Sequence, residues 1–294
     1  MKKYIYIICV ALTLVTGFAS CGDDDPKGDS IFVNTDKDNQ NAFDVWIYKN
    51  YTLPYNIRMM YKMQDIESDY NYTLAPADYN KSIQLAHIVK YAWLGAYDEV
   101  AGVDFTRTYV PKVLHFIGSA AYEHDTGVMV LGTAEGGLKV TLYLVNSLKL
   151  DRDFLNTYYF KTMHHEFAHI LHQTKNYDTD YNLISEGNYV NGEWYLYTDQ
   201  QAHQLGFVTR YSMSEAREDI AEVTSTYITK TQDEWDAIVK DAGDTGAPII
   251  NKKLAFVKKY MADSWGISLD KLRAVVQRRI NDVADNKIDL NNLD

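Results

Sequence analysis

The sequence predicts an α+β fold, in which the strands and most of the helices occupy separate parts of the chain. Candidate strands gather before residue 150, whereas helical periodicity dominates from residue 151 to the end. Segregation of this kind favours an α+β arrangement over an alternating fold with a parallel sheet. With 294 residues, 46% of them hydrophobic and 23% charged, the chain is long enough to bury a substantial core.

The first half of the chain contains the predicted small mixed sheet. A strand begins within residues 55–63, and the apolar positions of residues 77–101 have helical spacing. Residues 112–122 and 126–148 are predicted as strands, and the second segment as a hairpin that turns at Glu135-Gly136-Gly137.

The second half is predicted to be mainly helical. Residues 151–174 form one helix, and residues 175–207, which are rich in Asn, Gly, Asp, Tyr and Trp, form a long irregular loop. Residues 213–230 form another helix, for which Ser212 or Ser214 is the expected N-cap. Further helices are predicted over residues 233–242, 252–265 and 269–283.

Residues 1–20 have the features of an export leader. Two lysines precede the apolar run Tyr4–Phe18, which is too short to span a bilayer comfortably. The residues GFAS before Cys21 resemble the lipobox of bacterial lipoproteins, in which the cysteine becomes the acylated first residue of the mature chain. A plain secretory signal is the alternative, because Phe18 is untypical at the first lipobox position.

The cysteine count agrees with a lipid anchor. Cys9 lies inside the leader, so the mature chain keeps Cys21 alone and forms no internal disulfide. The run Asp23-Asp24-Asp25 resembles the surface-export signal of Bacteroidetes lipoproteins, and residues 21–42 are predicted as an acidic linker. These resemblances imply a surface-exposed outer-membrane lipoprotein. Its domain is expected to cover residues 43–294, with an α+β part to about residue 174 and a mainly helical part after it.

The net charge argues against one class of partner. The formal charge of the chain is −11, and removal of residues 1–20, which hold two lysines and no acidic residue, makes it −13. Nucleic-acid phosphates need a basic surface, so nucleic acid is not an expected partner.

The stretch MHHEFAHILHQ, residues 163–173, carries the pattern H-E-x-x-H at His165, Glu166 and His169. Histidines at i and i+4 lie on one side of a helix, about 6 Å apart along its axis, so both can reach one ion. Zinc favours imidazole and carboxylate ligands, with one position left open for catalysis. Glu166 lies beside the pair, where it can accept a proton from the attacking water and pass it to the leaving amine.

The helical wheel supports this assignment. One side of the helix is apolar and the other carries imidazoles, as expected for a buried stripe opposite a face turned toward a cleft. Satisfied core histidines, or a surface helix, would not require this segregation. The apolar side comprises Phe160, Met163, Phe167, Ile170 and Leu171, and the polar side comprises Tyr158, Thr162, His165, His169 and His172.

His164 and His172 are left out of the predicted metal site. His165 and His172 lie about 10 Å apart along a straight helix, too far for both to bind one ion with His169 between them. A metzincin would need a glycine at position 172 and a histidine at position 175, where this chain has His172 and Lys175. We therefore expect His164 and His172 to be surface residues or to support the ligands from behind.

The third ligand is expected to be a carboxylate from the helix over residues 213–230. That helix offers two i,i+4 pairs, Glu215 with Asp219 and Glu218 with Glu222. In either pair the first carboxylate would bind zinc, and the second would hydrogen-bond a ligand histidine and orient it. Periodicity leaves the choice open, because it does not label which face of the helix meets the metal.

The pattern HEFAH, followed about fifty residues later by a tyrosine and E-x-x-A-E, resembles the gluzincins related to anthrax lethal factor. The matching residues are Glu218-Asp219-Ile220-Ala221-Glu222, with Tyr211 upstream of them. The resemblance implies that Glu218 is the third ligand of one Zn²⁺, that Glu222 supports a ligand histidine, and that Tyr211 hydrogen-bonds the tetrahedral oxyanion. It also implies a zincin-like metallopeptidase fold.

The leader, the size and the motif placement resemble the Bacteroidetes zinc metallohydrolase lipoproteins associated with outer-membrane nutrient import. This resemblance implies a surface zinc metallopeptidase that acts on peptides, proteins or glycoproteins, is anchored to the membrane through Cys21 and is linked to import components. Substrate would align along an edge strand, for which residues 138–145 are the candidate.

The alternative function is a non-catalytic glycan- or peptide-binding accessory subunit, suggested by the aromatic residues of the loop over residues 175–207. Packing of that loop onto the body is the favoured interpretation of its aromatics. A decayed enzyme tends to lose its base or a ligand, and this chain retains all of these groups, which favours the peptidase.

Overall fold

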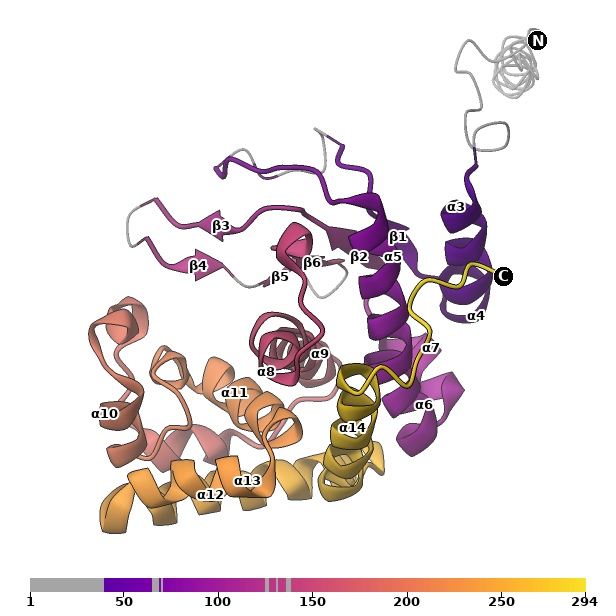
Figure 1. The fold of residues 1–294 in the computed structure, drawn as a ribbon. Helices are drawn as coiled ribbons and strands as arrows, with labels where there is room; N and C mark the ends of the chain where they lie inside the picture. The colour runs from indigo at the N-terminus through magenta and orange to yellow at the C-terminus, as the bar shows by residue number, and fades with distance from the viewer. Residues whose placement is uncertain (1–39, 65–68, 70, 125–126, 131, 136–138) are drawn as a thin grey trace, which may run out of the picture. The chain divides into compact units, whose positions relative to one another are not determined.

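The computed structural model describes residues 40–64, 69, 71–124, 127–130, 132–135 and 139–294. The predicted leader, Cys21 and the linker up to residue 39 lie outside the described residues, as do residues 136 and 137 of the predicted turn. Within the described part, the chain is mostly helical with a small mixed sheet, which confirms the α+β fold class (Figure 1). None of the described helices is both long enough and apolar enough to cross a bilayer.

The main sheet has four strands in the order β1-β2-β6-β5, of which β1, β2 and β6 are parallel and β5 is antiparallel to β6. The predicted hairpin is confirmed, but the predicted edge strand is wrong. Residues 138–145 contain β6, which lies between β2 and β5, so the edge of the sheet on this side is β5. The strands are β1 (Arg58–Met60), β2 (Val113–Phe116), β5 (Gly132–Glu135) and β6 (Lys139–Leu142), and a separate antiparallel ribbon joins β3 (Ala121–Tyr122) to β4 (Met129–Val130).

The predicted helix over residues 77–101 is confirmed. Asp78 caps it by accepting a 2.9 Å hydrogen bond from the Lys81 N–H. The helix runs as α5 (Tyr79–Ile88), the π-helical segment η3 (Val89–Leu94) and α6 (Gly95–Ala101). Two helical segments were not predicted from the sequence. They are the N-terminal run of α3 (Ala42–Ile47), η1 (Tyr48–Thr52) and α4 (Leu53–Tyr55), and the short helix α7 (Val103–Tyr109).

After the sheet the described chain is helical. Asp151 caps the predicted helix over residues 151–174, and the predicted helix over residues 213–230 begins after Glu215, whose side chain makes no capping bond, rather than after Ser212 or Ser214. The predicted loop is not wholly irregular, because Thr198 and Gln201 form a capping box at the start of a short helix. The elements are η4 (Val145–Ser147), α8 (Arg152–Leu155), η5 (Asn156–Phe160), α9 (Lys161–Thr174), η6 (Thr179–Ser185), η7 (Asn191–Leu196), α10 (Asp199–Gln204), η8 (Tyr211–Met213), α11 (Ala216–Thr229), α12 (Gln232–Asp241), α13 (Gly243–Trp265) and α14 (Leu269–Ala284).

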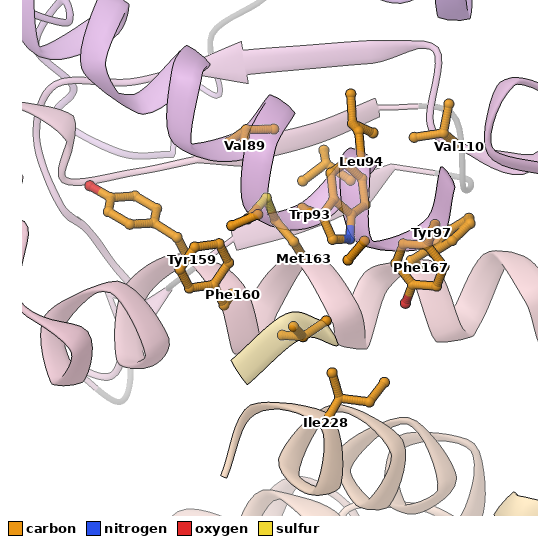
Figure 2. Close-up of a cluster of buried hydrophobic side chains, with 14 of the residues drawn as sticks. Val89, Trp93, Leu94, Tyr97, Val110, Tyr159, Phe160, Met163, Phe167 and Ile228 are labelled. Atoms are coloured by element: carbon orange, nitrogen blue, oxygen red, sulfur yellow. The ribbon is translucent and has the colours of Figure 1, made fainter. Parts of the chain in front are cut away.

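Helix α9 crosses the centre of the core. Its predicted apolar stripe is buried, and Figure 2 shows Met163 and Phe167 of this helix packed beneath Trp93 and Tyr97, with Ile228 of α11 on the other side. The Phe167 ring meets Tyr97 edge-on at a centroid distance of 4.7 Å. Because apolar contacts fix this side of α9, its opposite side is directed at the N-terminal half of α11.

A buried ion pair holds α11 from behind. Lys253 Nζ of α13 lies 2.7 Å from Asp219 Oδ2, and neither side chain is exposed to solvent. Lys253 Nζ also donates to the Gly206 carbonyl at 2.9 Å, and the Tyr189 hydroxyl donates to Asp219 Oδ2 at 3.1 Å. The pair therefore ties α11 to α13 and to the loop that precedes α11.

The variant Lys253→Met should lower the free energy of unfolding by about 3–5 kcal/mol, because it leaves a buried carboxylate without its counter-charge. The double variant Asp219→Asn, Lys253→Met should recover much of that loss. Urea unfolding at equal zinc content measures both, and Lys252→Met, at an exposed position of the same helix, should change stability by less than about 0.5 kcal/mol. A loss below about 1 kcal/mol in the single variant would refute the anchoring role.

Candidate metal centre

Three donor atoms from α9 and α11 converge on one point. His165 Nε2 lies 3.0 Å from His169 Nε2 and 3.0 Å from Glu218 Oε2, and His169 Nε2 lies 3.2 Å from the same oxygen. The helical spacing of four residues places both imidazoles on the face that meets α11. The structure thus brings Glu218 to the histidine pair, and Glu215 is not a member of this group.

The three atoms fit a zinc ion in chemistry and in spacing. Two imidazoles and one carboxylate make a common ligand set of catalytic zinc sites. A tetrahedral shell with bonds of about 2.05 Å places its ligand atoms about 3.3 Å apart, close to the separations found here. His165, His169 and Glu218 are therefore the residues that could hold the metal.

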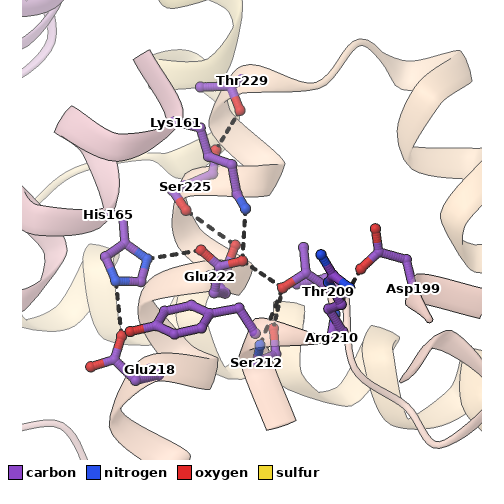
Figure 3. Close-up of polar contacts among 12 residues, drawn as sticks. Lys161, His165, Asp199, Thr209, Arg210, Ser212, Glu218, Glu222, Ser225 and Thr229 are labelled. Carbon is purple, nitrogen blue, oxygen red and sulfur yellow. Dashed lines mark hydrogen bonds and ion pairs between the residues drawn. The ribbon is translucent and has the colours of Figure 1, made fainter. Parts of the chain in front are cut away.

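Glu222 lies behind this group and orients it (Figure 3). Its Oε1 is 2.9 Å from His165 Nδ1, and its Oε2 accepts hydrogen bonds from Lys161 Nζ at 2.8 Å and Thr209 Oγ1 at 2.5 Å. A carboxylate can only accept, so His165 Nδ1 carries the hydrogen. Glu222 thereby fixes the ring so that Nε2 points toward Glu218 and His169.

Both ring nitrogens of His165 face carboxylates, and this sets its charge in the metal-free protein. Burial alone would lower the pKa of His165, but its hydrogen bonds with Glu218 and Glu222 outweigh burial and raise the pKa to about 10. Burial would also raise the pKa of the two glutamates. Hydrogen bonds with His165 and His169 instead lower the pKa of Glu218, and the charge of Lys161 and the bond with His165 lower the pKa of Glu222.

These shifts give the metal-free protein a defined pH window of stability. The raised pKa of His165 contributes stability that is complete below its ordinary value of 6.5 and is lost as the pH rises through about 10. The lowered pKa values of the two glutamates contribute stability that is complete above their ordinary value of 4.5 and is lost as the pH falls. Both contributions to the free energy of unfolding are complete only between pH 4.5 and pH 6.5.

A cleft of about 520 Å³ opens beside the donor group and is lined by Glu166 and Tyr211. Burial raises the pKa of the Glu166 carboxyl. Burial, together with the negative charges of Glu218 and Glu222, raises the pKa of Tyr211, so its hydroxyl stays protonated at neutral pH. The Tyr211 ring lies 5.9 Å from the His165 ring between centroids. The structure thus brings Glu166 and Tyr211 to one cleft with His165.

His164 and His172 are buried, so a surface position is wrong for both. The His164 side chain is fully enclosed, and its Nδ1 lies 2.9 Å from the Tyr97 hydroxyl. His172 packs edge-on against Tyr177 and Tyr260. Burial lowers the pKa of each to about 3, so both are neutral packing residues.

Two contacts of the site were not predicted from the sequence. Lys161 lies four residues before His165, on the same face of α9, and that spacing could have identified it as a partner for the second glutamate. Thr209 comes from the loop before α11, and no sequence pattern marks it. Both were missed because each acts on Glu222 rather than on the histidines.

The aromatic loop packs mainly on the body, as the favoured interpretation proposed. Tyr181 is fully buried and packs against Phe256 of α13, Tyr177 packs against Tyr260 of the same helix, and Trp194 packs edge-on against Tyr211. Tyr195, by contrast, is exposed. The loop therefore helps to build one wall of the cleft.

Comparisons with known proteins agree with this geometry. A family model described as "Putative zinc-binding metallo-peptidase" matches residues 36–270. A crystal structure described as a putative zinc-binding metallo-peptidase from Bacteroides caccae is 52% identical in sequence and aligns with a TM-score of 0.76. The alignment covers 86% of this chain and 96% of that one. No curated protein matches the chain.

In the zinc-free protein, the His165 imidazole should stay doubly protonated up to about pH 10, while His164 and His172 should stay neutral down to about pH 3. Imidazole ¹⁵N chemical shifts followed by NMR against pH measure all three. The variant Glu222→Gln should move the His165 midpoint downward, because it removes one of the two carboxylates that hold the proton. A His165 midpoint near the ordinary value of 6.5 in the unmodified protein would contradict this account.

Proposed function

Because this chain belongs to the family of "putative zinc-binding metallo-peptidases", we propose that it is a zinc-dependent metallopeptidase of the gluzincin type. His165, His169 and Glu218 are the ligands of one zinc ion, and Glu166 is the catalytic base. The observation that carries the proposal is the triangle of three donor atoms, each within 3.2 Å of the others, beside a cleft lined by Glu166. A helix with satisfied core histidines would not need a carboxylate at both nitrogens of one ring.

The reaction is hydrolysis of a peptide bond by water. When bound, zinc supplies a Lewis acid that polarises the scissile carbonyl and lowers the pKa of water. Glu166 accepts the proton that the attacking water loses and then delivers it to the leaving amine. Its pKa, raised by burial, suits a group that must both take and return a proton.

Tyr211 and Glu222 have supporting roles. The Tyr211 hydroxyl, kept protonated by its raised pKa, donates a hydrogen bond to the oxyanion that forms at the carbonyl carbon. Glu222 holds the Nδ1 hydrogen of His165, and Lys161 balances the charge of Glu222. This arrangement keeps His165 Nε2 available as a ligand.

The variant Glu166→Gln should lower kcat by about 10²- to 10⁴-fold, because the amide cannot take the proton, while zinc content stays unchanged. Hydrolysis of a peptide library, read out by mass spectrometry of new termini, measures the effect. Glu215→Gln, at an exposed position that does not line the cleft, is the matched control. Undiminished turnover in Glu166→Gln would refute the assigned mechanism.

The variant Glu218→Ala should weaken zinc binding by more than the roughly 10- to 100-fold that loss of an outer hydrogen-bond partner costs. Glu215→Ala should leave zinc binding unchanged, because Glu215 lies outside the donor group. Elemental analysis after dialysis against buffered zinc compares the two. The reverse pattern would transfer the ligand role to the other carboxylate pair.

The cellular setting is a second part of the proposal. We propose that the protein is an outer-membrane lipoprotein, acylated at Cys21 and exposed at the cell surface, where it cleaves peptides, proteins or glycoproteins in connection with nutrient import. Support comes from the lipobox-like residues before Cys21, from the absence of a second cysteine after the leader, and from the run Asp23-Asp24-Asp25.

The variant Cys21→Ser should lose its lipid, because no other cysteine follows the leader. Metabolic labelling with palmitate, followed by fractionation of membranes, measures this. Cys9→Ser should keep the label, because that residue lies in the removed segment. Continued labelling of Cys21→Ser would contradict the anchor.

A further inference from the structure

One lysine and one arginine line the cleft beside Glu166, and they differ in whether a carboxylate already balances their positive charge. Lys161 Nζ is 2.8 Å from the Glu222 carboxylate, so its charge is committed within the site. Arg210 also lines the cleft and is exposed, and among the residues described in the structure no carboxylate pairs with its guanidinium. Its positive charge is therefore available to a ligand.

Arg210 is nevertheless held in position. Its guanidinium carbon lies 5.8 Å from the centre of the Trp194 ring, and its Nη1 donates to the Tyr197 carbonyl at 3.5 Å. Its backbone N–H donates to Asp199 Oδ1 at 2.9 Å, which fixes the chain at this residue. Figure 3 shows Arg210 and Asp199 joined by this bond on the side of Thr209 away from His165. A cation that already contacts an indole ring loses less freedom on binding than a free surface side chain.

Two aromatic rings lie between this cation and the proposed catalytic centre. The Trp194 ring meets Tyr211 edge-on at a centroid distance of 5.0 Å, and Tyr211 lies 5.9 Å from the His165 ring. Arg210 is also the neighbour of Tyr211 in the chain. A group bound to Arg210 would therefore lie on the Tyr211 side of the scissile bond.

The remaining residues that line the cleft are apolar or acidic, and they limit where a negatively charged ligand group can bind. Val128, Met129 and Val130, at and before β4, add half-buried apolar side chains to its lining. Its acidic residues include Glu166 and Asp199, and the whole chain carries a net charge of −11. A substrate carboxylate would be repelled over most of this surface, and Arg210 is the position where it can be balanced.

We infer that Arg210 forms a subsite for a carboxylate of the peptide substrate, which is either an acidic side chain or the C-terminal carboxylate. The inference rests on the proposed peptidase function and adds a substrate class to it. The guanidinium offers a fork of donors that matches both oxygens of a carboxylate. Trp194 and the apolar residues of the β4 segment contact the neighbouring part of the peptide.

Binding tests the subsite without any need for cleavage. The probe is a set of fluorescent peptides bound to zinc-loaded Glu166→Gln protein, with one Glu or Gln scanned along a neutral sequence and the C-terminus free or amidated. In one register, a carboxylate should raise the affinity by about three- to tenfold at low salt, and less at high salt. A gain that persists in amidated peptides identifies an acidic side chain, and a gain that requires the free terminus identifies the terminal carboxylate.

Matched variants connect the gain to Arg210. Adding Arg210→Gln to the Glu166→Gln protein should abolish the difference in affinity between Glu and Gln peptides. Arg210→Lys should keep part of that difference, because the positive charge remains but the paired guanidinium donors are lost. Arg107→Gln removes an exposed cation from α7, outside the cleft, and should keep all of it. Equal affinity for acidic and neutral peptides in the parent protein, or a difference that survives Arg210→Gln, would overturn the subsite.

Measuring hydrolysis of the same peptides by the wild-type enzyme distinguishes failure of the Arg210 subsite from failure of the proposed peptidase function. Turnover that depends on Glu166 but ignores carboxylates would overturn the subsite alone. A carboxylate preference that depends on Arg210, in a protein that cleaves none of these peptides, would overturn the peptidase assignment and leave the subsite supported.

Discussion

The carboxylate of Glu222 is the contact on which the rest of the site depends. It is almost fully buried, and it accepts hydrogen bonds from His165 and Lys161 of α9 and from Thr209 of the loop before α11. Because Glu222 itself belongs to α11, its carboxylate joins three segments of the chain. A buried carboxylate is costly without such partners, so the three segments must come together in this arrangement. Glu218 lies one helical turn earlier on α11, and its position follows from the same contact.

The two helices that meet at Glu222 are each fixed from their far side. Apolar packing under Trp93 and Tyr97 holds α9, and the buried pair of Asp219 with Lys253 holds α11. Contacts outside the donor group therefore position both helices that carry the donors. In the metal-free state a proton on His165 balances the two glutamates, and a zinc ion that takes the place of that proton would find its ligands in position.

The sequence predicts one half of the site better than the other. The face of α9 is evident because its apolar stripe and its imidazoles separate at a period of 3.6. Helix α11 gives no such signal, since all side chains from Asp219 to Thr229 are buried, charged and apolar alike. Periodicity therefore left Glu215 and Glu218 as alternatives, and only the resemblance to a known motif favoured Glu218. The surface alternative for His164 and His172 was wrong because a neutral imidazole can pack in a core as readily as it can face water.

The fold was predictable where contacts are local, and less so where they are not. The hairpin of β5 and β6 follows from adjacent residues. Which of its two strands lies inside the sheet depends on the parallel pairing of β6 with β2, which is distant in sequence. The segment of α3, η1 and α4 was missed, although its aromatic residues Phe43, Trp46 and Tyr51 are buried in the main core. The position of the cleft wall formed by Trp194 and Arg210 likewise depends on how a long loop folds back, which local patterns do not specify.

The central claim is that one zinc ion is held by two histidines of α9 and one glutamate of α11. Anomalous diffraction at the zinc edge, from crystals grown with zinc, tests it most directly. The account predicts a single strong peak about 2.0–2.2 Å from His165 Nε2, His169 Nε2 and a carboxylate oxygen of Glu218. The absence of a peak there, or a peak at another group such as His203 with Asp241, would contradict it.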